Sequence, residues 1–380
     1  IEELVAILSG FIWGPIMLTL LVGTGLYLTI LLKGMQFRVL PHALSLIFKK
    51  DKSGEGDISH FAALMTALAA TVGIGNIVGV ATAITFGGPG AVFWMWVTGL
   101  VGMATKYSEA VLAVKYREKG KHGMRGGPMY YISKGAGLPW LGTLFAIFTA
   151  CAAFGIGNMT QSNATAKIFQ TTFQVPTEIT GIVLTLLTGL VILGGIKAIG
   201  KFTSILVPFM IATYVGCCLW VLALHINEIP EAFGLIFHHA FNPSAASGGF
   251  IGATIAAAMR YGIARGVFSN ESGLGSAPIA AAAARTSDPV KQALVSMTQT
   301  FIDTLVVCTM TALVILTATS WTQGVSAGEL TSASIAETLG VPGSTFVAIA
   351  TAFFAFSTLI GWSYYGEKAI EFLFGGKAIK

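Results

Sequence analysis

The chain has 380 residues, of which 54% are hydrophobic and only 10% are charged, and its mean hydropathy is +0.77. A soluble domain carries about 25% charged residues, so this composition excludes an ordinary water-soluble protein. The apolar residues form blocks of about 20 or more, enough to cross a bilayer as helix, and the short alternating strands of a membrane β-barrel do not occur in the sequence. The sequence therefore predicts an all-α polytopic membrane protein with one transmembrane domain, residues 1–380.

Nine segments are predicted to cross the membrane. The first has no basic residue before it and is about twice the apolar length of a secretory signal, so we expect a true span. The seventh is too long for one simple span. The segments lie near residues 5–32, 61–86, 90–115, 139–166, 178–195, 203–224, 249–285, 292–318 and 344–365.

The basic residues favour one orientation in the membrane. Lysine and arginine are concentrated in residues 33–52 and 115–134. The connections on the opposite side are acidic, and Lys167 is their only lysine or arginine. Positive charge marks cytoplasmic connections, which predicts a cell-membrane protein with its N-terminus outside. The same positions account for the net charge of +5 without a nucleic-acid partner.

Four connections are predicted to contain structure. Residues 37–48 and 128–135 are amphipathic and are expected to lie along the cytoplasmic interface. Residues 226–246 are expected to form a surface helix, and residues 325–340 an outer hairpin or lid.

Cysteine and histidine do not suggest a reactive site. The cysteines lie within apolar runs and are interpreted as small buried hydrophobes, and the six histidines lie in connections or at span ends. A membrane-embedded enzyme needs a metal cluster or a nucleophile–base pair inside the bilayer, so this class is disfavoured. The four cysteines are Cys151, Cys217, Cys218 and Cys308.

Two glycine-rich interruptions are expected to break helices. The segment Thr71–Gly79 has glycine at positions 73 and 75 followed by Asn76, which is poor helix and favours unwound backbone. In the seventh span, Gly262 and Gly266 separate two arms that are each about half a membrane long. Unwound backbone in a membrane must face protein, water or a ligand. Both breaks are therefore candidate binding sites, although the first is alternatively a kinked packing contact.

The two interruptions lie five spans apart, so their helices are expected to run antiparallel. Paired breaks in this arrangement indicate an inverted-repeat transporter, with repeats at about residues 61–224 and 249–380 after an extra helix at 1–32. Half-helix amino ends attract a carboxylate, and exposed carbonyls bind a cation. An amino-acid zwitterion with a metal cation fits such a site.

One acidic residue near the middle of the eighth span is a further functional candidate, as intramembrane charges usually are. It is Asp303, with Thr300 one turn before it. Asp303 is interpreted either as a cation ligand or as a structural partner of Arg260 or Arg265.

Three other charges also fall inside predicted spans. Lys106 and Glu109 are three residues apart on a helix and can pair with each other, in a structural or gating role. Glu271 is expected to pair with an arginine at an inner gate.

Two long motifs resemble the signatures of the alanine or glycine:cation symporter family. The first is Gly87–Val97 (GGPGAVFWMWV), followed by Gly102-Met103-Ala104 and Glu109, and the second is Gly262–Ser276 (GIARGVFSNESGLGS). The resemblance covers essentially the whole chain. It implies uptake of alanine or glycine together with sodium, without a cofactor, by a protein that acts as a monomer in the lipid bilayer.

The same resemblance implies the five-plus-five inverted-repeat fold shared with the leucine transporter, with an extra first helix. Only a short stretch follows the last predicted span. The last two core helices of the family are therefore expected to be absent from this chain.

The resemblance also implies a substrate site at the first break. Backbone N–H groups near Gly73 and Gly75 would hold the substrate carboxylate. A sodium ion would contact the carbonyl of Thr71 and the side-chain oxygen of Asn76, although Asn76 alternatively caps the second half-helix. The candidates for holding the substrate ammonium are carbonyls around Phe268 and the side chains of Ser269 and Asn270.

Other spans are expected to complete the site. Asn158 and Gln161 are candidate pocket residues with Phe154 as a wall, or else they make ordinary interhelical hydrogen bonds. By resemblance, a second sodium would lie at the hydroxyls of Ser357 and Thr358. The carbonyls of Ala69 and Val72 would be further ligands of that sodium. Trp362 would limit the size of the substrate pocket and so restrict the substrates to glycine, alanine and serine.

A proton-coupled transporter of the same fold is the nearest alternative, with Asp303 or Glu271 as the titrating group. A requirement for sodium at constant pH separates the two. A channel is disfavoured, because paired broken helices and an occluding tryptophan favour alternating access.

Overall fold

The structure is a computed structural model that describes residues 10–49, 54–120, 123–243 and 253–377. The described part is predominantly helical, as the sequence predicts. The first residues of the predicted spans 5–32 and 249–285 lie outside the described residues. The first elements are α2 (Pro15–Leu31), α3 (Met35–Leu46), α4 (His60–Thr71), η1 (Ile74–Asn76), α5 (Val78–Gly87), α6 (Gly90–Lys115), β1 (Glu118–Gly120), β2 (Gly123–Arg125), α7 (Pro128–Lys134), α8 (Pro139–Phe154), η2 (Gly155–Met159) and α9 (Thr160–Phe173).

The second half of the chain continues the helical pattern. Its elements are α10 (Thr177–Ile192), α11 (Gly195–Leu224), α12 (Ile229–Phe241), α13 (Ile255–Asn270), α14 (Ala277–Ala282), α15 (Pro289–Thr300), η3 (Phe301–Cys308), α16 (Thr309–Thr317), η4 (Ser320–Thr322), α17 (Leu330–Leu339) and α18 (Val341–Phe374). Helices α3, α7 and α12 lie in three of the connections predicted to contain structure. The fourth, residues 325–340, was expected to be an outer hairpin or lid and contains the helix α17. The antiparallel hairpin β1–β2 was not predicted.

Five single helices of the described chain are long and apolar enough to cross a membrane, and the bent pair α4–α5 is a sixth candidate. The five are Gly10–Leu31, Pro139–Phe173, Gly195–Leu224, Pro289–Thr317 and Val341–Phe374. These helices make the chain a multi-pass membrane protein. The exact number of nine spans stays a prediction.

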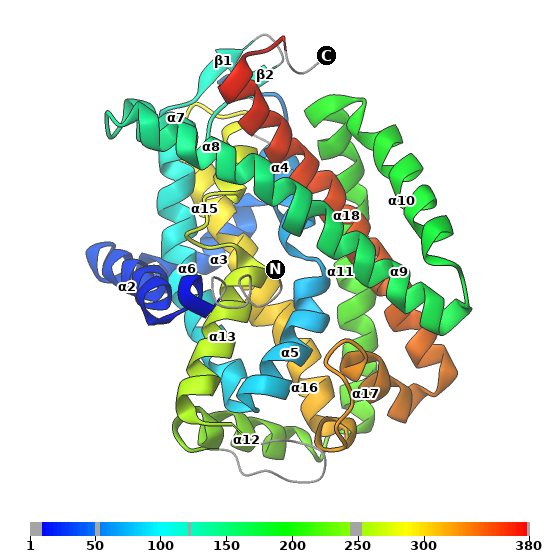
Figure 1. The fold of residues 1–380 in the computed structure, drawn as a ribbon. Coiled ribbons are helices and arrows are strands. Elements are labelled where there is room, and N and C mark those ends of the chain that lie inside the picture. The colour runs from blue at the N-terminus through cyan, green and yellow to red at the C-terminus, as the bar shows by residue number, and fades with distance from the viewer. Residues whose placement is uncertain (1–9, 50–53, 121–122, 244–252, 378–380) are drawn as a thin grey trace.

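The helices form two packed groups (Figure 1). In one group, α8, η2 and α9 make one long helix that crosses α18, with α10 and α11 beside it. In the other group, α6 packs against α13 and α15. The broken helix α4–α5 lies between the groups, because α4 contacts α11 and α18 as well as α14 and α15.

Polar caps define where several helices begin. Ser59 accepts a hydrogen bond from the N–H of Ala62 at the start of α4, and Thr254 accepts one from Ala257 at the start of α13, both at 3.1 Å. Asp288 caps α15 in the same way, and Pro289 follows at its first position. Such caps satisfy amide groups that have no partner within the helix.

The first predicted break is confirmed. Helix α4 ends at Thr71, a single turn of 3₁₀ helix follows as η1, and α5 begins at Val78. The two helices meet at an angle of 62°. The backbone therefore leaves the regular helical pattern in the middle of an apolar segment.

The prediction that the chain unwinds at Gly262–Gly266 is wrong. Helix α13 is continuous through both glycines, and the break follows it, between Asn270 and Ala277. A methyl group on Gly262 would collide with the backbone oxygen of Ala91, and one on Gly266 with the hydroxyl of Thr98. Two glycines four residues apart thus let α13 pack closely on α6, as small residues do between membrane helices.

The Gly262→Ala substitution is expected to destabilise the protein by about 1–3 kcal/mol, because the added methyl group overpacks the α6–α13 contact. The matched control is Gly216→Ala in α11, where an added methyl group meets nothing within 4 Å. Thermal unfolding in detergent should show a lower midpoint for Gly262→Ala and no such fall for Gly216→Ala. Equal midpoints would contradict the packing role.

Candidate functional site

The break between α4 and α5 is closed by polar side chains. The N–H of Gly73 donates to Oδ1 of Asn76 at 3.0 Å, and the N–H of Ile74 donates to Oε1 of Gln161 at 3.3 Å. Asn76 is fully buried and Gln161 almost so. The unwound backbone is therefore held from its own segment and from α9.

A buried carboxylate lies beside this break. Nδ2 of Asn76 donates to Oδ1 of Asp303, and the hydroxyls of Ser269 and Thr304 donate to Oδ2, all at 2.8 Å. Asp303 lies in the π-helical segment η3, a geometry that is frequent at functional sites. Asn76, Ser269, Asp303 and Thr304 are called the Asp303 cluster below.

None of the direct partners of Asp303 carries a positive charge. The arginines proposed as its partners stack on aromatic rings instead, Arg260 at 5.9 Å from the ring centre of Tyr261 and Arg265 at 5.7 Å from that of Phe268. No ion pair of Asp303 is found in the described part of the chain. A buried carboxylate without a cationic partner favours the binding of a cation or a proton.

A second group of oxygens lies on the other side of the break. The hydroxyl of Ser357 is 3.2 Å from the carbonyl oxygen of Ala69 and 3.4 Å from that of Val72. The neighbouring Thr358 comes so close to the break that a Cβ on Gly73 would lie 2.5 Å from its Oγ1. The four residues of the predicted second ion site are thus brought together.

The predicted ammonium site is partly assembled. The ring of Phe268 approaches Gly75, where a Cβ would lie 3.3 Å from it. Asn270 donates to the hydroxyl of Thr304 and accepts from the N–H of Ser272. The hydroxyl of Thr300 meets that of Ser272 at 3.1 Å and is not among the donors to the Asp303 carboxylate, which are Asn76, Ser269 and Thr304.

The expected pairing of Glu271 with an arginine is wrong. Its carboxylate accepts from Nε1 of Trp362 at 2.9 Å and from the hydroxyl of Ser276. Nζ of Lys106 donates to the main-chain oxygen of Glu271 at 3.0 Å. The ammonium group of Lys106 therefore lies at the C-terminal end of α13, where the helix dipole favours positive charge.

The predicted pair of Lys106 and Glu109 shows no hydrogen bond. Both residues are buried, and Oε2 of Glu109 has no hydrogen-bond partner in the described part of the chain. Lys106 is instead engaged with the break that follows α13.

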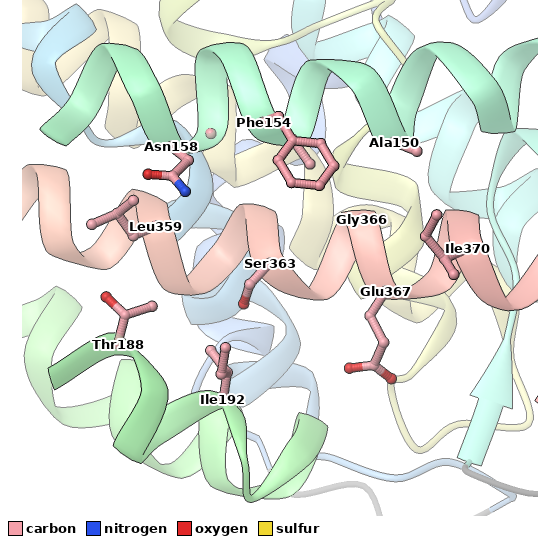
Figure 2. A pocket seen from close by; sticks show the side chains of 12 residues that line it. Ala150, Phe154, Asn158, Thr188, Ile192, Leu359, Ser363, Gly366, Glu367 and Ile370 are labelled. Atoms are coloured by element: carbon pink, nitrogen blue, oxygen red, sulfur yellow. The ribbon is translucent and has the colours of Figure 1, made fainter. Parts of the chain in front are cut away.

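Phe154 and Asn158 do not reach the break. Both are exposed, and they line a separate cavity of about 320 Å³ between α8, η2, α10 and α18. Figure 2 shows this cavity, with Thr188 on the α10 side and Ser363 and Glu367 on α18. No member of the Asp303 cluster lines it.

Two residues at the Asp303 cluster were not predicted from the sequence: Thr304, which belongs to it, and Cys308, which lies beside it. Thr304 donates to Asp303, and Sγ of Cys308 lies 3.3 Å from both Nδ2 of Asn76 and Oγ of Ser269. Cys308 was interpreted only as a buried hydrophobe. Its spacing of five residues from Asp303 matches one π-helical turn, a signal that exists only once the helix type is known.

Comparisons with known proteins identify the family. A model of the sodium:alanine symporter family matches residues 1–380. The chain is 56% identical over 391 residues to the "Sodium/alanine symporter AgcS" of Methanococcus maripaludis, covering 100% of this chain and 85% of that protein. It is 40% identical over 375 residues to the "Probable sodium/glutamine symporter GlnT" of Bacillus subtilis, covering 98% and 78%.

A solved structure supports the fold. The manganese transporter of Eremococcus coleocola, in complex with an aromatic bis-isothiourea substituted compound, superposes with a TM-score of 0.50 at 14% identity, over 86% of this chain and 70% of that one. At this identity the similarity concerns the fold alone. Together with the family match over the whole length, these findings show that the chain belongs to the sodium:alanine symporter family, a family of transporters and not of enzymes.

Proposed function

We propose that this chain imports alanine and glycine together with sodium by alternating access. The observation that carries the proposal is the unwound segment 72–77, which lies between a buried carboxylate without a cationic partner and a second group of oxygens. Family membership supports amino-acid transport coupled to a cation.

The first sodium would bind in the Asp303 cluster. Carboxylate, hydroxyl, amide and backbone oxygens are the ligands that hard cations prefer. Asp303 would supply the charge and Ser269 a hydroxyl oxygen. The Thr71 carbonyl and Oδ1 of Asn76 would complete the site, and Asn76 would turn for this, because its Nδ2 faces Asp303 and its Oδ1 accepts from Gly73 in this structure. Because one sodium offsets one carboxylate, the site becomes neutral when the ion binds.

The second sodium would bind where Ser357 and Thr358 face the carbonyl groups of Ala69 and Val72. These ligands are all neutral, so we expect this ion to bind more weakly than the first. Its contacts join α18, in one packed group, to the broken helix α4–α5, which lies between the groups. Ion binding at this place would therefore hold the broken helix against the group that contains α18.

The substrate would bind at the break itself. The carboxylate would face the N–H of Gly75 and that of Gly73, which donates to Oδ1 of Asn76 in this structure and would exchange this partner for the substrate. The ammonium would face the C-terminal end of α13 near Phe268. Phe268, whose ring approaches Gly75, and Trp362, which donates to Glu271 at the end of α13, would limit the substrate side chain to a small one. This arrangement favours alanine and glycine over larger amino acids.

The Gly73→Ala substitution is expected to lower sodium-driven alanine uptake to below about one tenth, since the added Cβ meets Thr358 and Gln161 at the proposed site. Gly79→Ala is the matched control, because a Cβ there meets nothing within 4 Å. Uptake of radiolabelled alanine into proteoliposomes measures both. Similar losses in the two variants would argue against a specific role for Gly73.

Coupling to protons is the second candidate, and one observation favours it. Asp303 is surrounded by neutral donors, so a proton would neutralise it as well as sodium would. Alanine uptake into proteoliposomes decides between the ions when a sodium gradient at constant pH is compared with a pH gradient without sodium. We expect uptake with the sodium gradient only. Uptake with the pH gradient alone would replace sodium by the proton in this proposal.

A further inference from the structure

The two broken helices meet at one end of the molecule. The segment 54–58 leads into α4, and the segment 282–286 leaves α14. Ile58 pairs with Ala284 as a parallel β-bridge: the N–H of Ile58 donates to the carbonyl oxygen of Ala283 at 3.2 Å, and the N–H of Arg285 donates back to that of Ile58 at 2.7 Å. This is the end that the positive charges predict to face the cytoplasm.

The contact between these segments leaves no space for side chains. A Cβ on Gly54 or Gly56 would collide with the backbone of residues 284–287. Both glycines also have positive φ angles, +80° and +158°. The two segments are therefore in direct backbone contact.

One side chain fastens both segments. Arg117, directly after α6, donates from Nη1 to the carbonyl oxygens of Ala282 at 3.0 Å and Ala284 at 2.6 Å. From Nη2 it donates to the carbonyl oxygens of Glu55 and Thr286, both at 2.7 Å. A guanidinium group carries five fixed N–H donors, and this one satisfies four acceptors. We call Arg117 with segments 54–58 and 282–286 the inner clamp.

The hairpin that follows Arg117 joins the inner clamp to α18. The N–H of Met124 donates to Oδ2 of Asp57 at 2.6 Å, within the clamp region. Nε of Arg125 donates to Oε1 of Glu371 in α18, also at 2.6 Å. Figure 1 shows the hairpin beside the end of α18. We call the pair Arg125–Glu371 the inner gate.

We propose that the inner clamp makes the inner ends of α4 and α14 move as one unit, and that the inner gate is the contact that separates when the transporter opens on this side. The proposal rests on alternating access, the transport mode proposed above. It assigns Arg117 and Arg125 as positioning residues with different tasks.

The two contacts differ in what their separation would expose. Opening the clamp would break the four backbone hydrogen bonds between the two segments and would part Arg117 from the carbonyl oxygens of one of them. Ile58, Ala283 and Ala284 are buried, so the loss of these backbone partners is costly. Opening the gate would leave Glu371 paired, because Nζ of Lys368 donates to its Oε2 at 2.8 Å. Arg125 is already partly exposed and can turn to water. Separation is therefore easier at the gate.

A cross-link tests the clamp. The double variant Ile58→Cys/Ala284→Cys is made in a background where Cys151, Cys217 and Cys218 are alanine, and its uptake is first measured in the reduced state. That measurement tests transport separately from the clamp. After oxidation, with the disulfide verified by mass spectrometry, we expect at least half of the uptake to remain. A fall below one tenth that dithiothreitol reverses, or a failure of the disulfide to form, would overturn the moving unit.

The accessibility of Cys308 tests the gate without any need for transport. Cys308 is buried beside Asn76 and Ser269, so a membrane-impermeant thiol reagent reaches it only when the protein opens. The protein with alanine at positions 151, 217 and 218 keeps Cys308 as its one cysteine. In everted membrane vesicles that contain this protein, the added substitution Arg125→Ala is expected to raise the modification rate of Cys308 at least tenfold. An unchanged rate would overturn the gate.

Two further variants complete the gate experiment. Lys119→Ala is the matched control, because it removes an exposed ion pair with Glu55 from the same hairpin, and it should leave the rate unchanged. Arg125→Lys keeps the charge and should restore most of the slow rate. A rise of the same size in Lys119→Ala, or no rescue by lysine, would show that the hairpin only loosens and would overturn the gate.

Discussion

The Asp303→Asn substitution is expected to lower sodium-dependent alanine uptake about 100-fold or more, which corresponds to about 3 kcal/mol of lost cation stabilisation. The amide keeps the size of the carboxylate but removes the charge that the direct partners of Asp303 do not offset. The half-saturating sodium concentration should rise together with the loss of uptake. Proteoliposome uptake over a range of sodium concentrations measures both quantities.

Asp288→Asn is the control for this prediction. It makes the same chemical change at the start of α15, where Asp288 caps the helix, and asparagine is an equally good cap. Uptake should remain close to that of the unmodified protein. If Asp303→Asn also kept its uptake and sodium dependence, Asp303 would not be the ion ligand.

The Trp362→Ala substitution is expected to widen the substrate range. Removal of the indole opens space beside the end of α13, where the substrate ammonium is proposed to bind, and also removes the hydrogen bond to Glu271. Uptake of methionine or leucine should become measurable, because an apolar pocket discriminates between side chains by only about 1–3 kcal/mol. Alanine uptake should fall by about tenfold, because the substrate loses its contact with the indole.

Trp362→Phe separates the two effects of that substitution. Phenylalanine keeps most of the ring volume but has no Nε1 donor for Glu271. We expect it to keep the preference for small amino acids while alanine uptake falls. Competition of unlabelled amino acids with labelled alanine gives the readout. A pocket that stays selective in Trp362→Ala would show that another group limits its size.

Part of the fold could be predicted because local sequence determines it. Gly73 and Gly75, two residues apart and followed by Asn76, disfavour helix, and the chain does break there. Gly262 and Gly266 are four residues apart, so both lie on one face of a helix and favour close packing. The second break therefore lies later in the chain than predicted, because only the first of these two spacings disfavours helix.

Part of the candidate site could be predicted because its polar residues stand out within apolar spans. Asn76, Ser357 and Asp303 lie where polar residues interrupt apolar spans, and the structure brings them to the break. Gln161 follows the π-helical segment η2 and reaches the break, whereas Phe154, directly before η2, and Asn158, within it, lie on the exposed side. Polarity within an apolar span therefore marked the right helix but did not determine which of its faces meets the break.

Contacts between distant segments could not be predicted in this way. Trp362 with Glu271, Lys106 with the end of α13, and Arg117 with the inner clamp each join residues far apart in sequence. Such pairs depend on how helices pack, and no local pattern specifies them. The hairpin β1–β2 was missed because strands of three residues are too short to show an alternating pattern.

The central claim is that the break binds the amino acid and the cation together, so each should strengthen the binding of the other. Isothermal titration of alanine into the purified protein, with sodium or with an equal concentration of choline, tests it most directly. We predict at least a tenfold tighter alanine dissociation constant in sodium for the unmodified protein, and no such gain for Asp303→Asn. The same alanine affinity in both salts would contradict a shared site at the break.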